Sequence, residues 1–99
     1  MQPSAHILIV EDDADIRRMV ADYLRRHGYR VRAARDGSDI ERVLEVSHID
    51  LFILDVMLPQ EDGLSLCRRI RARTGAPIMM LSATKPRRAI QIPAATMSK

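Results

Sequence analysis

Aromatic residues and cysteine are scarce in this sequence, and each scarcity excludes a class of protein. The 99 residues include two tyrosines, one phenylalanine and no tryptophan, so the chain lacks the aromatic platforms on which single-stranded nucleic acids stack. Cys67 stands alone. It cannot form a disulfide within the chain and has no CxxC partner for zinc. A reducing compartment fits this cysteine usage, and we expect Cys67 to be a packing residue.

Long hydrophobic runs are missing as well. The longest apolar runs span only a few residues, whereas a transmembrane helix needs about 20. Residues 1–6 contain no basic region followed by a long apolar segment, as a secretory signal would. We therefore expect a cytoplasmic protein with no membrane association. The content of 46% hydrophobic and 29% charged residues is typical of one soluble globular domain.

Acidic residues are absent from the end of the chain. Residues 1–84 carry 12 Arg and 13 Asp or Glu, a net charge of −1, whereas residues 85–99 hold four basic residues and no acid, which gives the overall +3. We therefore place a domain boundary after residue 84. The Arg pairs at 17–18, 25–26 and 68–69 are expected on exposed helix faces and termini. Because no basic helix lies beside aromatic residues, we expect no direct nucleic-acid binding.

Apolar residues alternate between strand-like and helix-like spacing along the chain. Short runs at 7–10, 29–34, 51–54 and 77–81 predict strands, and the first, third and fourth are apolar enough to be buried on both faces. Between them, apolar residues at helical spacing predict helices that include 16–24, 40–44 and 66–70. The order βαβαβαβ predicts an α/β fold, with a parallel sheet covered by helices on both faces.

Polar side chains follow the predicted strands at the points where the strands end. Glu11 and Asp12 follow the first strand, Asp55 the third and Ser82 the fourth. The carboxyl ends of parallel strands share one edge of a sheet, where ligands bind near the point at which the strand order reverses. Carboxylates that meet there at roughly 4 Å repel by about 4 kcal/mol per pair at an effective dielectric near 20. Such a cluster therefore requires a counter-charge.

Magnesium is the counter-ion that this set of ligands favours. Oxygen ligands that leave room for water and a phosphate are typical of Mg²⁺ sites. The ion would let an anionic phosphoryl donor approach Asp55, which we interpret as the nucleophile. Ser82 would then donate a hydrogen bond to the bound phosphoryl group. Asp13 is expected to cap the helix that follows it rather than to bind the ion, and Gly28 is expected to close that helix.

Three segments of the sequence resemble the receiver domain of response regulators, and the OmpR-type subclass is the most similar: ILIVEDDADIRRMVADYLRRHGY, DLFILDVMLPQEDGLSLCRRIR and PIMMLSA. The resemblance covers residues 7–83. It implies a flavodoxin-like (CheY-like) doubly wound parallel sheet. It also implies a signalling module rather than an enzyme, which receives a phosphoryl group from a sensor histidine kinase in a two-component phosphorelay.

The resemblance assigns a role to each polar residue at the strand ends. Asp55 takes the position of the phospho-acceptor, and Glu11 and Asp12 take those of the acidic pair that binds Mg²⁺. Asp55 itself and the backbone carbonyl of Met57 complete the protein ligands of the metal. Ser82 takes the position of the switch hydroxyl.

The sequence after Ala83 departs from the family pattern. Relatives continue with a fourth helix, a fifth strand that ends in Lys-Pro and a fifth helix, whereas here Lys85 follows Ser82 almost at once and Lys99 is the last residue. Neither lysine can be assigned to the phosphate. We expect a sheet that is incomplete at the fifth strand and fifth helix, and a basic tail at 85–99 that is disordered or forms a substitute strand. We expect no DNA-binding domain in this chain.

The consequence expected for assembly is a monomer. The fourth predicted strand would be left as an exposed apolar edge, which favours non-specific association. The dimer that forms on phosphorylation in OmpR-type relatives uses the elements that are missing here, so we expect no such dimer.

Two other classes of protein fail on particular residues, and a third interpretation stays open. A haloacid-dehalogenase-type phosphatase needs a second acid two residues after its nucleophile, where this chain has Met57. A dinucleotide-binding domain needs a glycine-rich turn after the first strand, whereas the acids at 11–13 would repel a pyrophosphate. The open alternative is a truncated or degenerate receiver that acts as an interaction module without productive signalling.

Overall fold

Strands and helices alternate along the chain as the sequence predicts. The computed structural model describes residues 4–81, with β1 at His6–Val10, α1 at Ala14–Arg26, β2 at Arg30–Ala34, α2 at Ile40–Val46, β3 at Leu51–Asp55, α3 at Gly63–Arg71 and β4 at Ile78–Leu81. Ser82, Lys85, Lys99 and the basic tail at 85–99 lie outside the described residues, so the expectations for them stay predictions.

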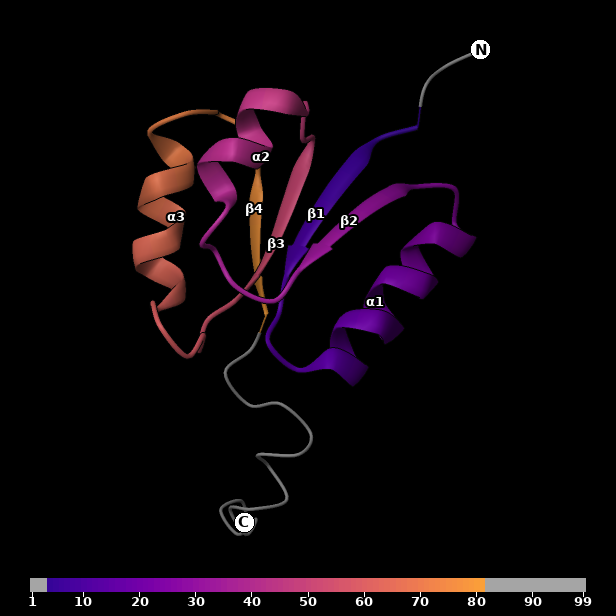
Figure 1. Cartoon of the computed structure of the whole chain (residues 1–99). Coiled ribbons are helices and arrows are strands. Elements are labelled where there is room, and N and C mark those ends of the chain that lie inside the picture. The colour runs from indigo at the N-terminus through magenta and orange to yellow at the C-terminus, as the bar shows by residue number, and fades with distance from the viewer. Residues whose placement is uncertain (1–3, 82–99) are drawn as a thin grey trace, which may run out of the picture.

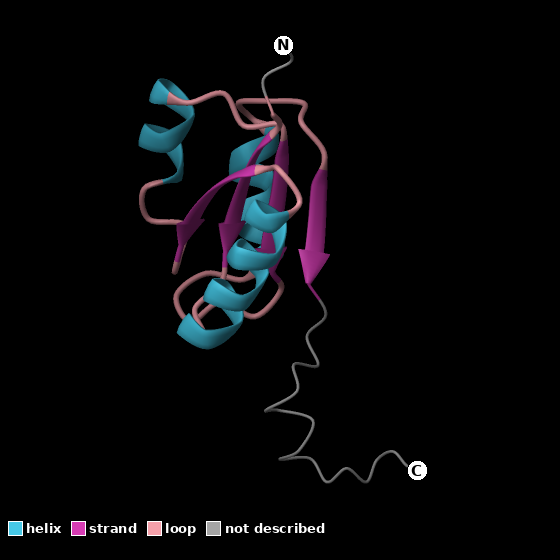
Figure 2. Cartoon of the chain, turned by 90° about the vertical axis from the view of Figure 1, so that its right-hand side faces the viewer, coloured by secondary structure: helices cyan, strands magenta, loops and turns pink. Residues whose placement is uncertain are grey.

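The four strands form one parallel sheet in the order β2-β1-β3-β4. Ile9 of β1 is paired with Ala33 of β2 on one side and with Ile53 of β3 on the other, and Ile53 is in turn paired with Met79 of β4. The arrowheads of the strands all point the same way in Figure 2, so their carboxyl ends lie at one edge. The chain moves from β1 outward to β2 and later returns to β3, so the order reverses between β1 and β3. This topology confirms the flavodoxin-like, doubly wound fold class.

Helices lie on both faces of the sheet, α1 on one and α2 and α3 on the other (Figure 1). Successive residues of a strand point to opposite faces, so β1 and β3 supply both layers of the core. The larger apolar cluster lies on the side of α2 and α3 and includes Leu8, Phe52 and Leu66, all fully buried. The smaller cluster, on the side of α1, is built on Ile9 and Ile53.

The apolar face of α1 is less buried than its amphipathic pattern predicts. Met19 is 63% and Tyr23 56% exposed, and Ala21 is the buried residue of the helix. Val20 and Leu24 pack against the smaller cluster, because α1 lies against β1 and β2. The apolar stripe of α1 is therefore wider than its contact with the sheet.

Within the described residues the fourth strand is a partly exposed edge of the sheet, as expected, although its apolar sequence is typical of a strand buried on both faces. Met79 is 53% exposed, and the other residues of β4 are half-buried. Within residues 4–81, β4 is paired with β3 alone, and α1 lies over β1 and β2 rather than over β4. The strand begins at Ile78 rather than at Pro77, because proline has no N–H to donate. The carbonyl of Pro77 still accepts a hydrogen bond from the N–H of Phe52 at 3.0 Å.

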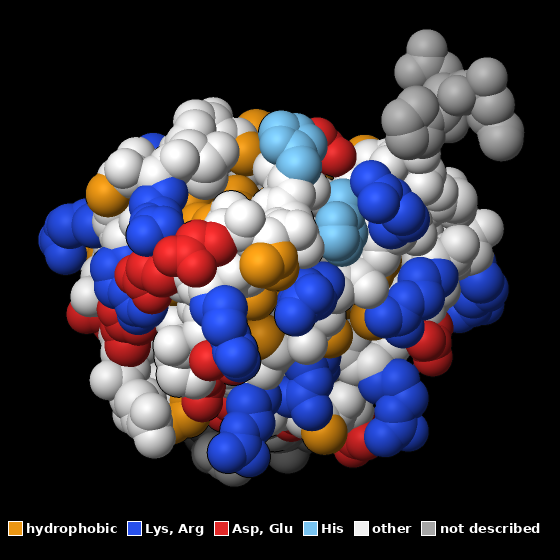
Figure 3. Space-filling model, turned by 45° about the horizontal axis from the view of Figure 1, so that its top comes forward, with side chains coloured by type: hydrophobic (Ala, Val, Ile, Leu, Met, Phe, Trp, Pro, Cys, Tyr) orange, Lys and Arg blue, Asp and Glu red, His pale blue; other side chains and the backbone are white. Residues whose placement is uncertain are grey.

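The surface carries charges of both signs. Arg side chains are interspersed with acidic ones on the face drawn in Figure 3, as is typical of a solvated surface. Within residues 4–81, every helix is too short or too polar to cross a membrane.

Candidate functional site

The acidic residues at the end of β1 are held by the backbone around them. The N–H of Glu11 donates to the carbonyl of Ala34 at 3.0 Å, which extends the ladder between β1 and β2 by one residue. Its side chain is fully buried, and its Oε2 accepts a hydrogen bond from the N–H of Asp13 at 2.9 Å. The next residue, Asp12, is half-buried. Glu11 therefore lies inside the edge of the sheet, and Asp12 lies nearer to solvent.

Asp13 is the N-cap of α1, as the sequence predicts. Its Oδ1 accepts a hydrogen bond from the N–H of Ile16 at 3.0 Å, and its backbone is extended as an N-cap requires. Gly28, with φ of +92°, follows the end of the same helix. Arg17, in the first turns of α1, donates through Nη1 to the carbonyl of Glu11 at 2.8 Å and is half-buried, unlike the exposed residue expected. The capped helix thus fixes the turn that carries Glu11 and Asp12.

Asp55 is the last residue of β3 rather than the residue after it, because it still pairs with Leu81 of β4. The side chain is fully buried. Its Oδ1 accepts a hydrogen bond from the N–H of Met57 at 2.9 Å, which sets the orientation of the carboxylate. The Met57 side chain is exposed, so its contribution at this edge comes from its backbone.

The structure brings three of the predicted site residues together. Glu11, Asp12 and Asp55 each place one carboxylate oxygen within 4.8 Å of the others. They lie after β1 and at the end of β3, which is where the strand order reverses. Two like charges about 4.8 Å apart repel by about 3 kcal/mol at an effective dielectric near 20. The donors are oxygen alone, and Asp12 is partly exposed to solvent, so the residues present fit a hard divalent cation that keeps part of its water.

Gly63 fits closely behind Asp55, which the sequence alone does not reveal. It is the first residue of α3, and a Cβ built on it would lie 2.8 Å from the backbone oxygen of Asp55 and 2.9 Å from Cα of Val56. Its N–H donates to the carbonyl of Val56 at 2.9 Å. The preceding residue, Asp62, caps α3 by accepting the N–H of Ser65 at 2.7 Å. The start of α3 is therefore packed directly against the backbone of the candidate site.

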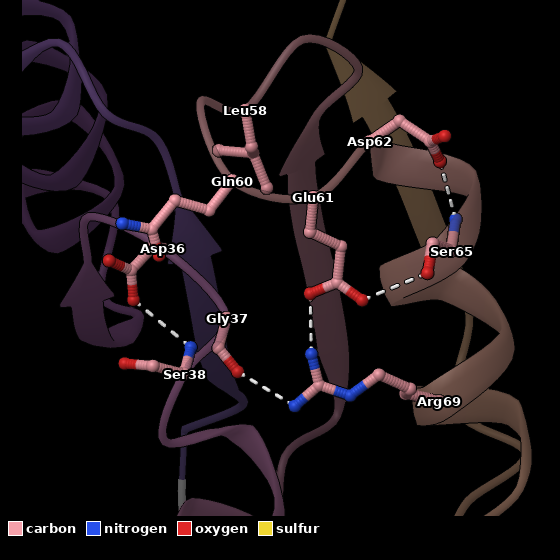
Figure 4. Close-up of a pocket in the computed structure, with 9 residues that line it drawn as sticks. All are labelled: Asp36, Gly37, Ser38, Leu58, Gln60, Glu61, Asp62, Ser65 and Arg69. Atoms are coloured by element: carbon pink, nitrogen blue, oxygen red, sulfur yellow. Dashed lines mark hydrogen bonds and ion pairs between the residues drawn. The ribbon is translucent and has the colours of Figure 1, made fainter.

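A pocket of about 570 Å³ lies at the same edge of the sheet as the acidic cluster, between the loops that precede α2 and α3 (Figure 4). Its lining residues are Asp36, Gly37, Ser38, Leu58, Gln60, Glu61, Asp62, Ser65 and Arg69. Arg69 was expected on an exposed helix face, but it is half-buried and bonded to Glu41, Glu61 and the carbonyl of Gly37. Sequence spacing gives no signal for this arrangement, because the partners lie on other elements.

The pairing of Arg69 with Glu41 shifts the pKa values of both side chains. The hydrogen bond from Arg69 lowers the pKa of Glu41 below its ordinary value of 4.5. The bond to Glu41 in turn raises the pKa of Arg69, with a further contribution from the charge of Glu61. The guanidinium therefore favours the ionised form of Glu41.

Residues 7–97 match the response regulator receiver domain family, so the chain belongs to this family of signalling modules. The match runs past Ala83, where the resemblance visible in the sequence ends. The protein PetR of Rhodobacter capsulatus is 45% identical over 78 residues, which are 79% of this chain and 33% of PetR. The transcriptional regulatory protein GltR of Pseudomonas aeruginosa is 47% identical over 81 residues, with 79% of this chain and 34% of GltR covered. The chain thus spans about a third of the length of these relatives.

Solved structures of receivers share the fold. The receiver domain of the hybrid histidine kinase CckA gives a TM-score of 0.74 at 38% identity and covers 83% of this chain and 79% of its own. Response regulator TrrA of Thermotoga maritima, in complex with Mg²⁺-BeF, gives 0.73 at 27% identity, with 89% and 76% covered. TrrA in complex with histidine kinase ThkA gives 0.74 at 30% identity, with 82% and 71% covered. The predicted receiver domain is confirmed, and the OmpR-type subclass stays a prediction.

Proposed function

We propose that this chain is the phospho-accepting receiver of a two-component phosphorelay, with Asp55 as the phospho-acceptor and a sensor histidine kinase as the donor. The observation that carries the proposal is the meeting of three carboxylates within 4.8 Å at the reversal point of the sheet, one of them at the end of β3. The complex of ThkA with TrrA supports a kinase as the partner. From the sequence we add a cytoplasmic location, and a monomer without membrane or nucleic-acid binding.

In this proposal Glu11, Asp12, Asp55 and the backbone carbonyl of Met57 hold Mg²⁺. The bound ion would offset the repulsion among the carboxylates and the charge of an incoming phosphoryl group. Glu11 is fully buried and bonded to the N–H of Asp13, which suits a ligand that acts through water. Asp12 is more open to solvent, which suits a direct ligand. TrrA, whose solved structure contains Mg²⁺-BeF, supports the choice of ion.

The chemistry proposed for Asp55 is nucleophilic attack on phosphorus. A carboxylate oxygen forms a bond to the phosphorus of phosphohistidine, the P–N bond breaks, and the imidazole leaves and takes up a proton from solvent. The product is an acyl phosphate on Asp55. The N–H of Met57 fixes the orientation of the carboxylate before the reaction. Ser82, the residue after Leu81 in the sequence, would donate a hydrogen bond to the transferred group.

Binding of a phosphoryl mimic tests this function. We expect beryllofluoride to bind only when Mg²⁺ is present, with a fluorine NMR signal that is absent in Asp55→Asn. Asp12→Asn should weaken Mg²⁺ binding about tenfold or more, whereas Asp13→Asn should leave it nearly unchanged, because Asn is an equally good N-cap. A signal that persists in Asp55→Asn would contradict the proposal. The absence of any signal in the wild type would favour the degenerate interaction module.

A further inference from the structure

The loop at 56–62 connects Asp55 to α3 and is held at its base by the backbone. The N–H of Met57 donates to Oδ1 of Asp55 at 2.9 Å, and the N–H of Gly63 donates to the carbonyl of Val56 at 2.9 Å. Met57 also forms an isolated antiparallel bridge with Asp62. The two ends of the loop are therefore linked, and a shift of residues 61–62 would be passed to Met57.

Arg69 ties this loop to two other segments. Its guanidinium donates to both carboxylate oxygens of Glu41, on α2, at 3.0 and 2.6 Å. The same group donates to the carbonyl of Gly37 at 2.9 Å and to Oε1 of Glu61. Figure 4 shows Glu61 between Arg69 and Ser65, whose hydroxyl lies 3.0 Å from the other oxygen of Glu61. Both oxygens of Glu61 are thus held by α3.

The bonds to Glu41 and Gly37 fix the guanidinium itself. A planar guanidinium bonded to both oxygens of one carboxylate has a defined plane and direction, unlike the compact ammonium of lysine. The Arg69 side chain is 32% exposed and that of Glu61 is 20% exposed, so the Glu61 bond is partly shielded from water. An anchored, partly buried pair is more rigid than an exposed ion pair.

We propose that Arg69 is a positioning residue for the phosphorylation site, acting through Glu61 on the loop that carries Met57. This inference rests on the proposed function. Arg69 touches neither the acceptor nor the metal ligands in this account. It fixes the position of residues 61–62. Through the bridge between Asp62 and Met57, it thereby fixes the Met57 N–H that donates to Asp55 and the Met57 carbonyl.

The loss of the Arg69 charge and the loss of its positioning role would change the affinity for Mg²⁺ in opposite directions. Removal of the Arg69 charge leaves the negative charges of Glu41 and Glu61 unbalanced, which would strengthen the attraction of the protein for a cation. Loss of positioning would weaken Mg²⁺ binding, because the carbonyl of Met57 and the carboxylate of Asp55 would no longer be held together. The sign of the change therefore separates the two roles.

The test compares variants of Arg69 and Glu61 with a second ion pair, which links α2 to the segment that follows α3. Arg73, two residues after the end of α3, lies 4.0 Å from Glu45 of α2, so Arg73→Met removes an arginine–glutamate pair away from the loop. We expect Arg69→Met to weaken Mg²⁺ binding, measured by calorimetry, about tenfold, and Arg73→Met to leave it within about twofold. Urea unfolding monitored by circular dichroism checks that each variant is folded.

Glu61 provides a second comparison if Arg69→Met does not fold. Glu61→Gln and Glu61→Ala lose the same charge, but only Gln keeps an acceptor for Arg69. We expect Ala to weaken Mg²⁺ binding several-fold more than Gln, and Arg69→Met to add little to Glu61→Ala in the double variant. Equal effects of Gln and Ala, or tighter binding in Arg69→Met, would overturn the inference. Failure of the wild type to bind Mg²⁺ would instead refute the proposed function, and this inference with it.

Discussion

Gly63→Ala offers a quantitative test of the packing behind Asp55. The added methyl group would lie 2.8 Å from the backbone oxygen of Asp55, 2.8 Å from Cε of Met80 and 2.9 Å from Cα of Val56. The methionine methyl can rotate away, but the two backbone atoms belong to the last residue of β3 and the residue after it, and can move only with the strand. We therefore expect the substitution to force a shift at the acceptor itself.

The magnitude follows from two opposing effects. Overpacking of a close-fitted position costs about 1–3 kcal/mol, while Ala is favoured over Gly within a helix by up to about 1 kcal/mol. The net expectation is a loss of about 1–2 kcal/mol in the free energy of unfolding. At roughly 4–8 °C per kcal/mol for a domain of this size, the melting temperature would fall by about 4–16 °C.

Gly75→Ala is the matched control for this substitution. Nothing lies within 4 Å of a Cβ at Gly75, and its φ is not in the left-handed region, so the change should be neutral or stabilising by up to about 1 kcal/mol. Both variants are compared with the wild type by urea unfolding, followed by circular dichroism. If Gly63→Ala were as stable as Gly75→Ala, the close approach of α3 to Asp55 would be refuted.

Three further predictions concern the cap, the metal and the pH dependence. Asp62→Ala should cost about 1 kcal/mol in urea unfolding and Asp62→Asn only a few tenths, because Asn keeps the acceptor for the first turn of α3; equal losses would exclude a capping role. Asp12→Ala should weaken Mg²⁺ binding more than Glu11→Ala in calorimetric titration, and equal losses would mean that the direct and water-mediated roles are misassigned. The pKa of Glu41 is lowered by Arg69, so the stability that its ionised form contributes is present above its ordinary pKa and is lost as the pH falls through the lowered value. Between about pH 5 and pH 3, Glu41→Gln should therefore lose less stability than the wild type, and identical pH profiles would contradict this.

The strand and helix positions could be predicted from the sequence because they follow from local periodicity. Residues 7–10 and 51–54 are continuous apolar runs, and both are strands in the interior of the sheet. The meeting of Glu11, Asp12 and Asp55 could also be predicted, because parallel strands bring their carboxyl ends to one edge. The acidic part of the site is thus a consequence of topology, which a sequence pattern encodes well.

Features that depend on contacts between distant elements could not be predicted in this way. Arg69 is bonded to Glu41 and Gly37, which lie 28 and 32 residues away in the sequence. Helical spacing alone places Arg69 on an exposed face. The need for glycine at 63 arises from a close approach to β3 rather than from a turn or a positive φ. The exposure of Met19 depends on which neighbours cover it, and a residue's own hydrophobicity does not report that.

The central claim is that Asp55 accepts a phosphoryl group in the presence of Mg²⁺. The most direct measurement is intact-protein mass spectrometry of wild type and Asp55→Asn after incubation with a small phosphoryl donor such as phosphoramidate, with and without Mg²⁺. Asn keeps the acceptor for the N–H of Met57 but is a far weaker nucleophile. The account predicts one added phosphoryl group in the wild type with Mg²⁺, and none in Asp55→Asn or in the presence of a chelator. Equal incorporation in wild type and Asp55→Asn, or none in either, would contradict it.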